Sequence, residues 1–365
     1  MSRPSARAAE RPRPGVHQHV ASGARDVRCG GRRVRLRVHK RRLECGNPSC
    51  EILDAPLASV RHLGIDEHCH GKPRWTRDPG TGEYQLPADR WHACFTDLSG
   101  QQQMIGQARG RTAGDAAYWL AQARAAWRDR IEIVCIDMCT IYLSAVRRAL
   151  PGAQVAVDLF HVVHLANNTL GDVRRRAIRD KYGRRGRSGD PEYGIKNLLT
   201  RNLEHLSPEQ FAKAAGTLGK DAAGQQIAAA WIAKEKLRHA LNLRARTTGS
   251  TPCERQVRDR LFAFYDWCAQ NDDIPELVSL ARTISRWQNQ IVCAVLSGVT
   301  NAGSESLNRL AKLEARVAYG FRNPAHQQRR VQIACARTAR RTEPRVRSVT
   351  RIRKQTVTRR QHEPG

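Results

Sequence analysis

Two aspartates in this sequence directly follow short apolar runs that are typical of buried β-strands. The run 131–136 ends at Asp137, and the run 154–157 ends at Asp158. In an α/β sheet, ligands and metals bind beyond the carboxyl ends of parallel strands, so each aspartate is a candidate metal ligand. Either one could instead cap the helix that follows by accepting backbone N–H bonds.

A third acid, Asp66, follows the strand-like run 62–65. The predicted order of elements is three strands, then helix, strand, helix, strand and helix, which is the order of the ribonuclease H-like α/β fold. In that fold the first and fourth strands lie side by side, so Asp66 and Asp137 are expected to meet. Adjacent carboxylates repel each other unless a divalent cation lies between them, which predicts a Mg²⁺ or Mn²⁺ site.

The rest of the chain falls into segments of different character. Residues 61–165 hold the first part of the predicted core, with Thr112 capping a helix over 112–127. Residues 300–336 supply its last helix, with Ser304 as the expected cap and Glu305 just after it. The remaining segments are a disordered basic segment 1–25, a small basic region 26–60 with a strand at 34–43, an all-helical insertion 166–299 with helices at 207–219, 223–242, 254–270 and 275–297, and a disordered basic tail 337–365.

Charge dominates the composition of the chain. The 365 residues include 63 Lys and Arg against 34 Asp and Glu, which gives a net charge of +29. Such a field favours a polyanion, with nucleic acid ahead of a membrane surface. There is no apolar run of about 18 residues and no signal peptide, so we expect a cytoplasmic protein associated with the bacterial nucleoid.

The cysteines give only a weak indication of a metal site. Their number is 11, and their scatter over a long chain favours reduced thiols over a disulfide framework. Cys45 and Cys50 could form half of a zinc site, but no companion pair is found, and a structural zinc site needs four ligands. We therefore expect either an incomplete site or two ordinary cysteines, and no stably bound Zn²⁺.

Five motifs in order resemble the ISL3 family of bacterial insertion-sequence transposases. The motifs are GIDE at 64–67, IDM at 136–138, DLFHVVH at 158–164, TNAGSESLN at 300–308 and RVAYGFRN at 316–323. The similar region covers roughly residues 61–336. The resemblance implies a ribonuclease H-like DDE catalytic domain interrupted by a helical insertion. It also implies metal-dependent DNA strand cleavage and strand transfer during transposition.

The resemblance also implies roles for individual residues. Asp66, Asp137 and Glu305 would be the catalytic acids that hold two Mg²⁺ or Mn²⁺ ions. Asp158, His161 and Asn308 would support the site. Asp158 remains an alternative second acid, although the fold places that acid on the fourth strand and so favours Asp137.

The expected partner is double-stranded DNA, both the element ends and the target, with two copies of the chain joining two ends as a homodimer. Phosphate contacts are expected from arginines in the insertion and after the last helix. The candidates are Arg174, Arg175, Arg176, Arg184, Arg185, Arg316 and Arg322.

The N-terminal region departs from the family pattern. Members usually open with a zinc ribbon of two cysteine pairs, followed by helix-turn-helix segments, whereas only Cys45 and Cys50 match here. The chain is therefore interpreted as a shortened member. The alternative function is a catalytically inactive, truncated transposase that binds DNA or inhibits the full-length enzyme.

Overall fold

The computed structural model describes residues 15–29, 32–44, 60–69, 75–86, 90–100, 103–244, 249–250, 252–318, 321 and 324–342. The chain divides into two compact units, residues 1–59 and 60–365, and each is described by itself. Within these described ranges, no helix combines the length and the apolar character needed to cross a lipid bilayer.

The first unit, where it is described, is an antiparallel hairpin of β1 (Gly15–Cys29) and β2 (Arg32–Glu44). β2 contains the predicted strand 34–43. The prediction of disorder for 1–25 is wrong over 15–25, because pairing with β2 satisfies the backbone hydrogen bonds of this segment. Cys45 and Cys50 lie outside the described residues, so the zinc-ribbon interpretation stays a prediction.

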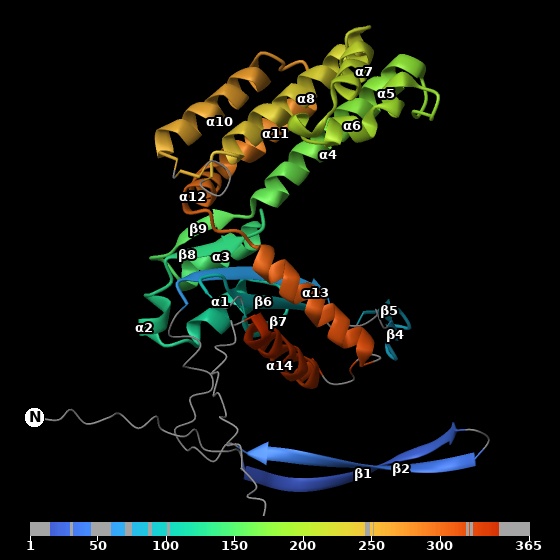
Figure 1. The fold of residues 1–365 in the computed structure, drawn as a ribbon, viewed down its shortest axis with the longest axis vertical. Coiled ribbons are helices and arrows are strands. Elements are labelled where there is room, and N and C mark those ends of the chain that lie inside the picture. Colours follow the sequence, from blue (N-terminus) through green and yellow to red (C-terminus); the bar gives the residue numbers. More distant parts are fainter. Residues whose placement is uncertain are drawn as a thin grey trace, which may run out of the picture. The chain divides into compact units, whose positions relative to one another are not determined.

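The second unit is built on a five-stranded mixed sheet with the order β7-β6-β3-β8-β9 (Figure 1). β3, β6 and β7 are antiparallel neighbours, whereas β8 and β9 run parallel to β3. The first and fourth predicted strands therefore lie side by side, as expected. The strands span His62–Cys69 (β3), Trp91–Asp97 (β6), Met104–Arg109 (β7), Ile133–Ile136 (β8) and Gln154–Val157 (β9).

Helices cover both faces of this sheet. On one face α1 (Ala113–Ala121) stacks Trp119 on Phe95 of β6, with ring centroids 3.9 Å apart. Successive side chains of a strand point to opposite faces, so Cys94 points the other way. It packs there with residues of α13 (Ala302–Val317) and α14 (Pro324–Thr342), including Leu307 and Val331.

Several helix boundaries differ from the predictions. Thr112 caps α1 through a capping box, as predicted, but α1 ends at Ala121 and a separate turn, α2 (Ala125–Arg128), follows. Asn301, and not Ser304, is the N-cap residue of α13. The predicted disordered tail is wrong over 337–342, because α14 continues to Thr342 on an apolar stripe that packs beside α13.

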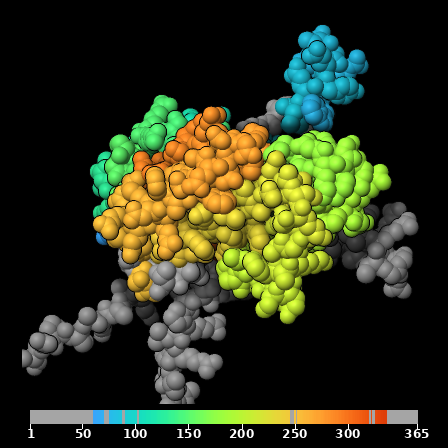
Figure 2. Space-filling view, turned by 90° about the horizontal axis from the view of Figure 1, so that it is seen from above, coloured from blue at the N-terminus to red at the C-terminus, as the bar shows by residue number. Residues whose placement is uncertain are grey.

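Two small elements complete the core region. α3 (Thr140–Ala149) connects β8 to β9. The two-residue strands β4 (Thr76–Arg77) and β5 (Tyr84–Gln85) form a hairpin that projects from the body of the unit, in light blue at the upper right of Figure 2.

The predicted insertion is helical throughout its described part and covers the face of the unit seen in Figure 2. The predicted boundary at residue 166 falls inside α4, and the predicted helix 275–297 breaks at Trp287. The helices are α4 (Leu159–Tyr182), α5 (Pro191–Gly194), α6 (Lys196–Thr200), the 3₁₀ helix Leu203–His205, α7 (Pro208–Leu218), α8 (Ala222–Leu241), α10 (Glu254–Ala269), α11 (Pro275–Arg286) and α12 (Gln288–Ser297).

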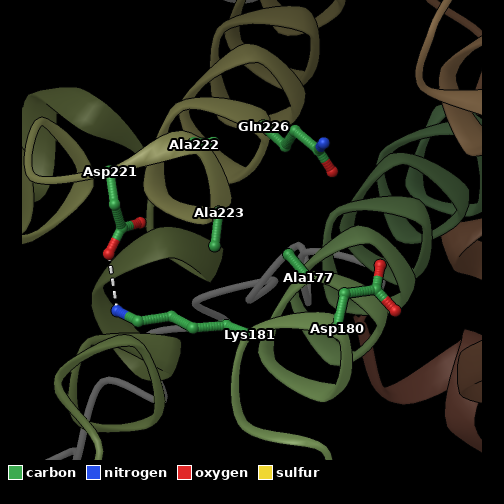
Figure 3. Close-up of a pocket in the computed structure, with 7 residues that line it drawn as sticks. All are labelled: Ala177, Asp180, Lys181, Asp221, Ala222, Ala223 and Gln226. Carbon is green, nitrogen blue, oxygen red and sulfur yellow. Dashed lines mark hydrogen bonds and ion pairs between the residues drawn. The ribbon is translucent and has the colours of Figure 1, made fainter.

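Ion pairs join the helices of the insertion. At the end of α4, Lys181 Nζ donates to Asp221 Oδ2 at 2.6 Å (Figure 3). It also donates to Glu192 Oε1 at 2.7 Å. Earlier on the same helix, Arg176 Nε donates to Glu276 Oε1 of α11 at 2.8 Å. Trp231 and Trp287 are buried.

The close approach of α1 to the sheet gives a stability test. A Cβ at Gly106 would lie 2.0 Å from the ring of Trp119, so Gly106→Ala must displace the stacked pair. We expect it to lower the free energy of unfolding by about 1–3 kcal/mol, the usual range for an overpacked core. Gly152→Ala is the matched control, because a Cβ there meets nothing within 4 Å. Equal denaturation midpoints for the two variants would contradict the packing described.

Candidate functional site

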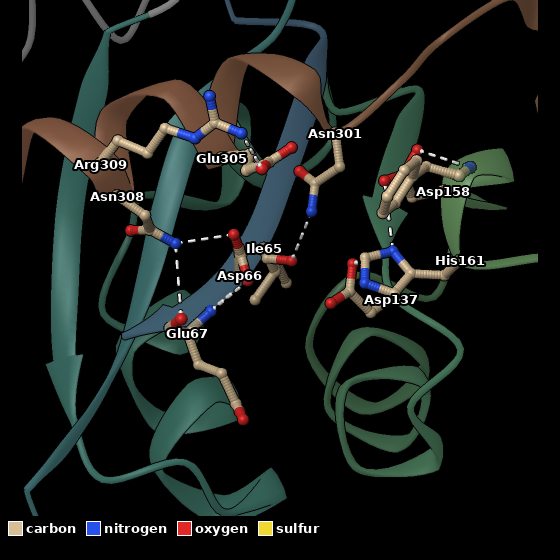
Figure 4. A network of polar contacts seen from close by, with 11 residues as sticks. Ile65, Asp66, Glu67, Asp137, Asp158, His161, Asn301, Glu305, Asn308 and Arg309 are labelled. Atoms are coloured by element: carbon tan, nitrogen blue, oxygen red, sulfur yellow. Dashed lines mark hydrogen bonds and ion pairs between the residues drawn. The ribbon is translucent and has the colours of Figure 1, made fainter. Parts of the chain in front are cut away.

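Three aspartates occupy the same position on three neighbouring parallel strands. The described pairing of β3 with β8 ends where Gly64 meets Cys135, and β9 continues the same row. Asp66 follows Gly64 by two residues on β3. Asp137 and Asp158, each the first residue after its strand, stand at the equivalent positions after β8 and β9. Since alternate residues of a strand face the same side, the three carboxylates start from one face at one edge of the sheet (Figure 4).

Asp137 and Asp158 were each possible helix caps, and only Asp158 serves as one. Cys139, and not Asp137, is the N-cap residue of α3, and it makes no side-chain capping bond. Asp158 does cap α4, where its Oδ1 accepts from the backbone N–H of Phe160 at 3.5 Å. Asp137 therefore has no capping role.

Asp137, Asp158 and His161 form a cluster that we call the metal group. The Nδ1 atom of His161 lies 3.3 Å from Asp137 Oδ1 and 3.3 Å from Asp158 Oδ2. Each residue offers one ligand atom, and these atoms all lie within 4.8 Å of one another. Two carboxylate oxygens and an imidazole nitrogen are ligands of divalent metals, so these residues fit such an ion.

The electrostatics of the metal group disfavour bare negative charge. Burial raises the pKa of Asp137 to about 6; the charge of His161 opposes this rise, and the carboxylates of Asp66 and Asp158 add to it. Burial also raises the pKa of Asp66. The hydrogen bond to Asp158 raises the pKa of His161, which favours a cation at this point. A divalent ion would supply the same compensation more strongly.

Two asparagines of α13 connect this helix to the acids. Asn308 Nδ2 donates to Asp66 Oδ2 at 2.7 Å, which agrees with the predicted supporting position of Asn308. Asn301 Nδ2 donates to the backbone oxygen of Ile65 at 3.3 Å, and the Asn301 side chain also acts to lower the pKa of Asp137. The sequence analysis missed Asn301, although an asparagine directly before a helix is a recognisable N-cap signal.

Gly64 allows α13 to approach β3 this closely. A Cβ at Gly64 would lie 2.3 Å from Ser304 Oγ and 2.8 Å from Asn301 Oδ1. The absent side chain is therefore required for the helix to lie against the strand that carries Asp66.

Glu305, the predicted third acid, is not part of the metal group. It follows Asn301 by four residues and precedes Asn308 by three, so it lies on the same helical stripe. Its side chain is 58% exposed and pairs with Arg309 at 2.6 Å (Figure 4). The structure therefore brings together Asp66, Asp137, Asp158, His161 and Asn308, with Glu305 beside them on α13 but facing Arg309.

The predicted DNA-binding arginines differ in how they are engaged. Arg176 and Arg184 are held by acids within the insertion, Arg184 through two bonds of 2.8 Å to Asp190. Arg175 pairs with Asp172. The remaining candidates are Arg174, whose guanidinium lies 5.9 Å from the ring of Tyr193, the exposed Arg185 and Arg316, and Arg322, which lies outside the described residues.

Replacing Asp137 by asparagine removes a carboxylate whose charge the metal-free fold disfavours. Because the pKa of Asp137 is higher in the folded chain than in the unfolded chain, the protonated carboxyl group stabilises the fold. This contribution is fully present below pH 3.8 and is lost as the pH rises through about 6. At neutral pH we therefore expect Asp137→Asn to raise the free energy of unfolding of the metal-free chain. With 30% of the side chain exposed, the discounted gain is about 1 kcal/mol, or about 2–4 °C in melting temperature.

Added metal should reverse this order of stability. Mn²⁺ should raise the melting temperature of the native chain and leave that of Asp137→Asn unchanged, because binding to the folded state alone stabilises it. Asp273→Asn, in the exposed turn between α10 and α11, should behave like the native chain. A metal-free Asp137→Asn chain less stable than the native chain would contradict this account.

Comparison with known proteins identifies the family of the chain. The model of the DDE transposase family ISL3, described as transposase, matches residues 80–331. The transposase for insertion sequence element IS1557 of Mycobacterium tuberculosis, from two strains, is 30% identical over 303 residues. That alignment covers 73% of this chain and 58% of each relative, so the chain spans little more than half the length of these relatives.

Among solved structures, the Drosophila P element transposase strand transfer complex aligns over 77% of both chains, with 12% identity and a TM-score of 0.38. A likeness this weak adds nothing about the site. The family match and the relatives, in contrast, cover most of the chain and agree with each other. This chain belongs to the ISL3 family of insertion-sequence transposases.

Proposed function

We propose that this chain is a DDE transposase that cleaves DNA strands and transfers them to a target in a metal-dependent reaction. The observation that carries the proposal is the matched row of Asp66, Asp137 and Asp158 at one edge of the sheet, with His161 against two of them. Family membership supports the same reaction. The relatives are named as transposases for an insertion sequence element.

The strand order supports a ribonuclease H-like catalytic domain. Three antiparallel strands are followed by two strands parallel to the first, and the first and fourth are neighbours. Because β3 carries Asp66 and β8 is followed directly by Asp137, this order supports a site in which these two acids act together.

Asp66 and the metal group, which includes Asp137, would hold the divalent ions, Mg²⁺ or Mn²⁺. When bound, such ions supply activation of water or of a 3′-hydroxyl and stabilisation of the leaving oxygen. The chain itself orients the acids through Asn301 and Asn308 and keeps Asp137 partly shielded from water. No covalent protein intermediate is needed, so no cysteine has a role.

We propose Glu305 as a further metal ligand. Its ion pair with Arg309 lies on an exposed helix face, and such pairs contribute only about 0–1 kcal/mol. Little free energy is therefore lost when the Glu305 side chain turns from Arg309 toward Asp66 and Asp137, which the same stripe of α13 already faces.

DNA binding is proposed to rest on phosphate contacts. The net charge of +29 supplies affinity that does not depend on base sequence. Exposed arginines such as Arg185 and Arg316 are better placed for this than Arg176 and Arg184, which fix helices of the insertion. A homodimer on DNA is proposed because two element ends must be joined.

The test is nicking and strand transfer on duplexes that carry the flanking ends of the element, with Mg²⁺ or Mn²⁺. Asp66→Asn, Asp137→Asn and Glu305→Gln should each lower the nicking rate at least about 100-fold, because even losing a partner of a metal ligand costs about 10–100-fold. Glu254→Gln is the matched control for Glu305. Glu254 is 56% exposed and pairs with Arg258 at 2.6 Å, four residues away on α10.

Each outcome separates the alternatives. Equal nicking by Glu305→Gln and Glu254→Gln would remove Glu305 from the site without affecting the other acids. If the native chain bound these duplexes in a salt-sensitive way but never nicked them, catalysis would be excluded. The chain would then act as a binding remnant or an inhibitor of a full-length relative.

A further inference from the structure

Phe160 is an exposed aromatic ring beside the metal group. Its side chain is 65% exposed, whereas the preceding Leu159 is buried at 4%. A phenyl ring left this open to water buries little apolar surface and so contributes little to folding. Single exposed apolar side chains are common on protein surfaces, so the place of this ring beside the metal group, and not its exposure alone, carries the argument.

The position of the ring is fixed by the same residues that form the metal group. The backbone N–H of Phe160 donates to Asp158 Oδ1, and its ring meets that of His161 edge-on, with centroids 5.7 Å apart. His161 in turn lies 3.3 Å from both acids. The ring thus stands one side chain away from the atoms that would hold a metal and a phosphate.

A second ring continues this surface along α4. His164 follows Phe160 by one helical turn, and the two rings are nearly parallel, with an interplanar angle of 20° and centroids 6.3 Å apart. The amide nitrogen of Asn168 lies 3.2 Å from His164 Nδ1 and orients that ring. Phe160, His164 and Asn168 are all exposed, so α4 presents flat rings and hydrogen-bonding groups on one stripe.

We propose that Phe160 is a stacking platform for one unpaired nucleobase of the DNA strand bound at the metal group, with His164 as the neighbouring ring. The proposal rests on the proposed function, because it requires a DNA strand with its phosphate at the acids. The Phe160 ring centroid lies 5.7 Å from that of His161, a member of the metal group, so a base stacked on Phe160 would belong to a nucleotide at or next to the bound phosphate. Flat aromatic rings stack on any base, so the platform tolerates any sequence.

The position of the Phe160 ring and the charge of the chain indicate which kind of molecule binds against the ring. A chain of net charge +29 draws a nucleic acid strand to it, and the metal group requires a phosphate there. A second copy of the chain is the competing occupant of an exposed ring, and its binding would change the mass of the particle.

The test compares binding to two DNA probes in the presence of Ca²⁺ in place of Mg²⁺ or Mn²⁺, because Ca²⁺ takes carboxylate ligands but has a looser geometry, so that binding is measured without cleavage. One probe is a fully paired duplex, and the other carries a single unpaired thymine in the same sequence. The native chain should prefer the second probe by about 5- to 150-fold, the range expected for one stacked base. Phe160→Ala should lose this preference, Phe160→Trp should keep it, and Phe160→Leu, which is apolar but not flat, should lose it.

Phe262→Ala is the matched control. Phe262 is 69% exposed on α10 and is not part of the site, so its removal should leave the preference unchanged. Replacing the unpaired thymine with 5-iodouracil should give a light-induced crosslink that maps to the peptide containing Phe160. This crosslink should be lost in Phe160→Ala.

The outcomes distinguish this proposal from the proposed function. An unchanged preference in Phe160→Ala, or a crosslink that maps elsewhere, would overturn the stacking role while leaving nicking and its acids untouched. A change in particle mass on Phe160→Ala with the preference retained would assign the ring to a contact between copies. If the native chain nicked no DNA yet kept the Phe160-dependent preference, the proposed cleavage would fail and the base platform would stand.

Discussion

Repulsion between carboxylates is the constraint on which the rest of this structure depends. Parallel pairing of β3, β8 and β9 brings one end of each strand to the same edge of the sheet, where Asp66 lies on β3 and Asp137 and Asp158 directly follow β8 and β9. Their charges are unfavourable at such a distance when water is partly excluded. The neighbouring groups offset this cost: His161, whose pKa is raised, lies between two of the acids, and Asn308 donates an N–H to Asp66.

Those asparagines come from a distant part of the sequence. Asn308 and the acid that it contacts are 242 residues apart, with the whole insertion between them. The site therefore exists only when α13 has returned to β3, and Gly64 provides the space for that contact. This places a requirement on the insertion: its first and last helices must bring the chain back to the sheet.

The sequence predicted the sheet more fully than it predicted the site. Strand runs and their order were sufficient to predict that the first and fourth strands, β3 and β8, lie side by side. The cluster of Asp137 and Asp158 with His161 was visible only as a motif, since its distances depend on where β9 ends and on the first turn of α4. The contact of Glu305 with Arg309 follows from side-chain rotation on an exposed helix, which the pattern of residue types does not determine. Asn301 was missed because its side chain serves a neighbouring strand and not its own helix.

The helix α4 gives the molecule a mechanical property. It is uninterrupted over 24 residues, about 36 Å in length. Its first turn carries His161 and is capped by Asp158, while its far half is tied to α8 and α11 through Lys181 and Arg176. The border between the sheet region and the insertion therefore lies within the continuous helix α4 and not in a flexible connection. Any tilt of the insertion, such as one imposed by a bent DNA duplex, is transmitted directly to the donor atoms of the metal group.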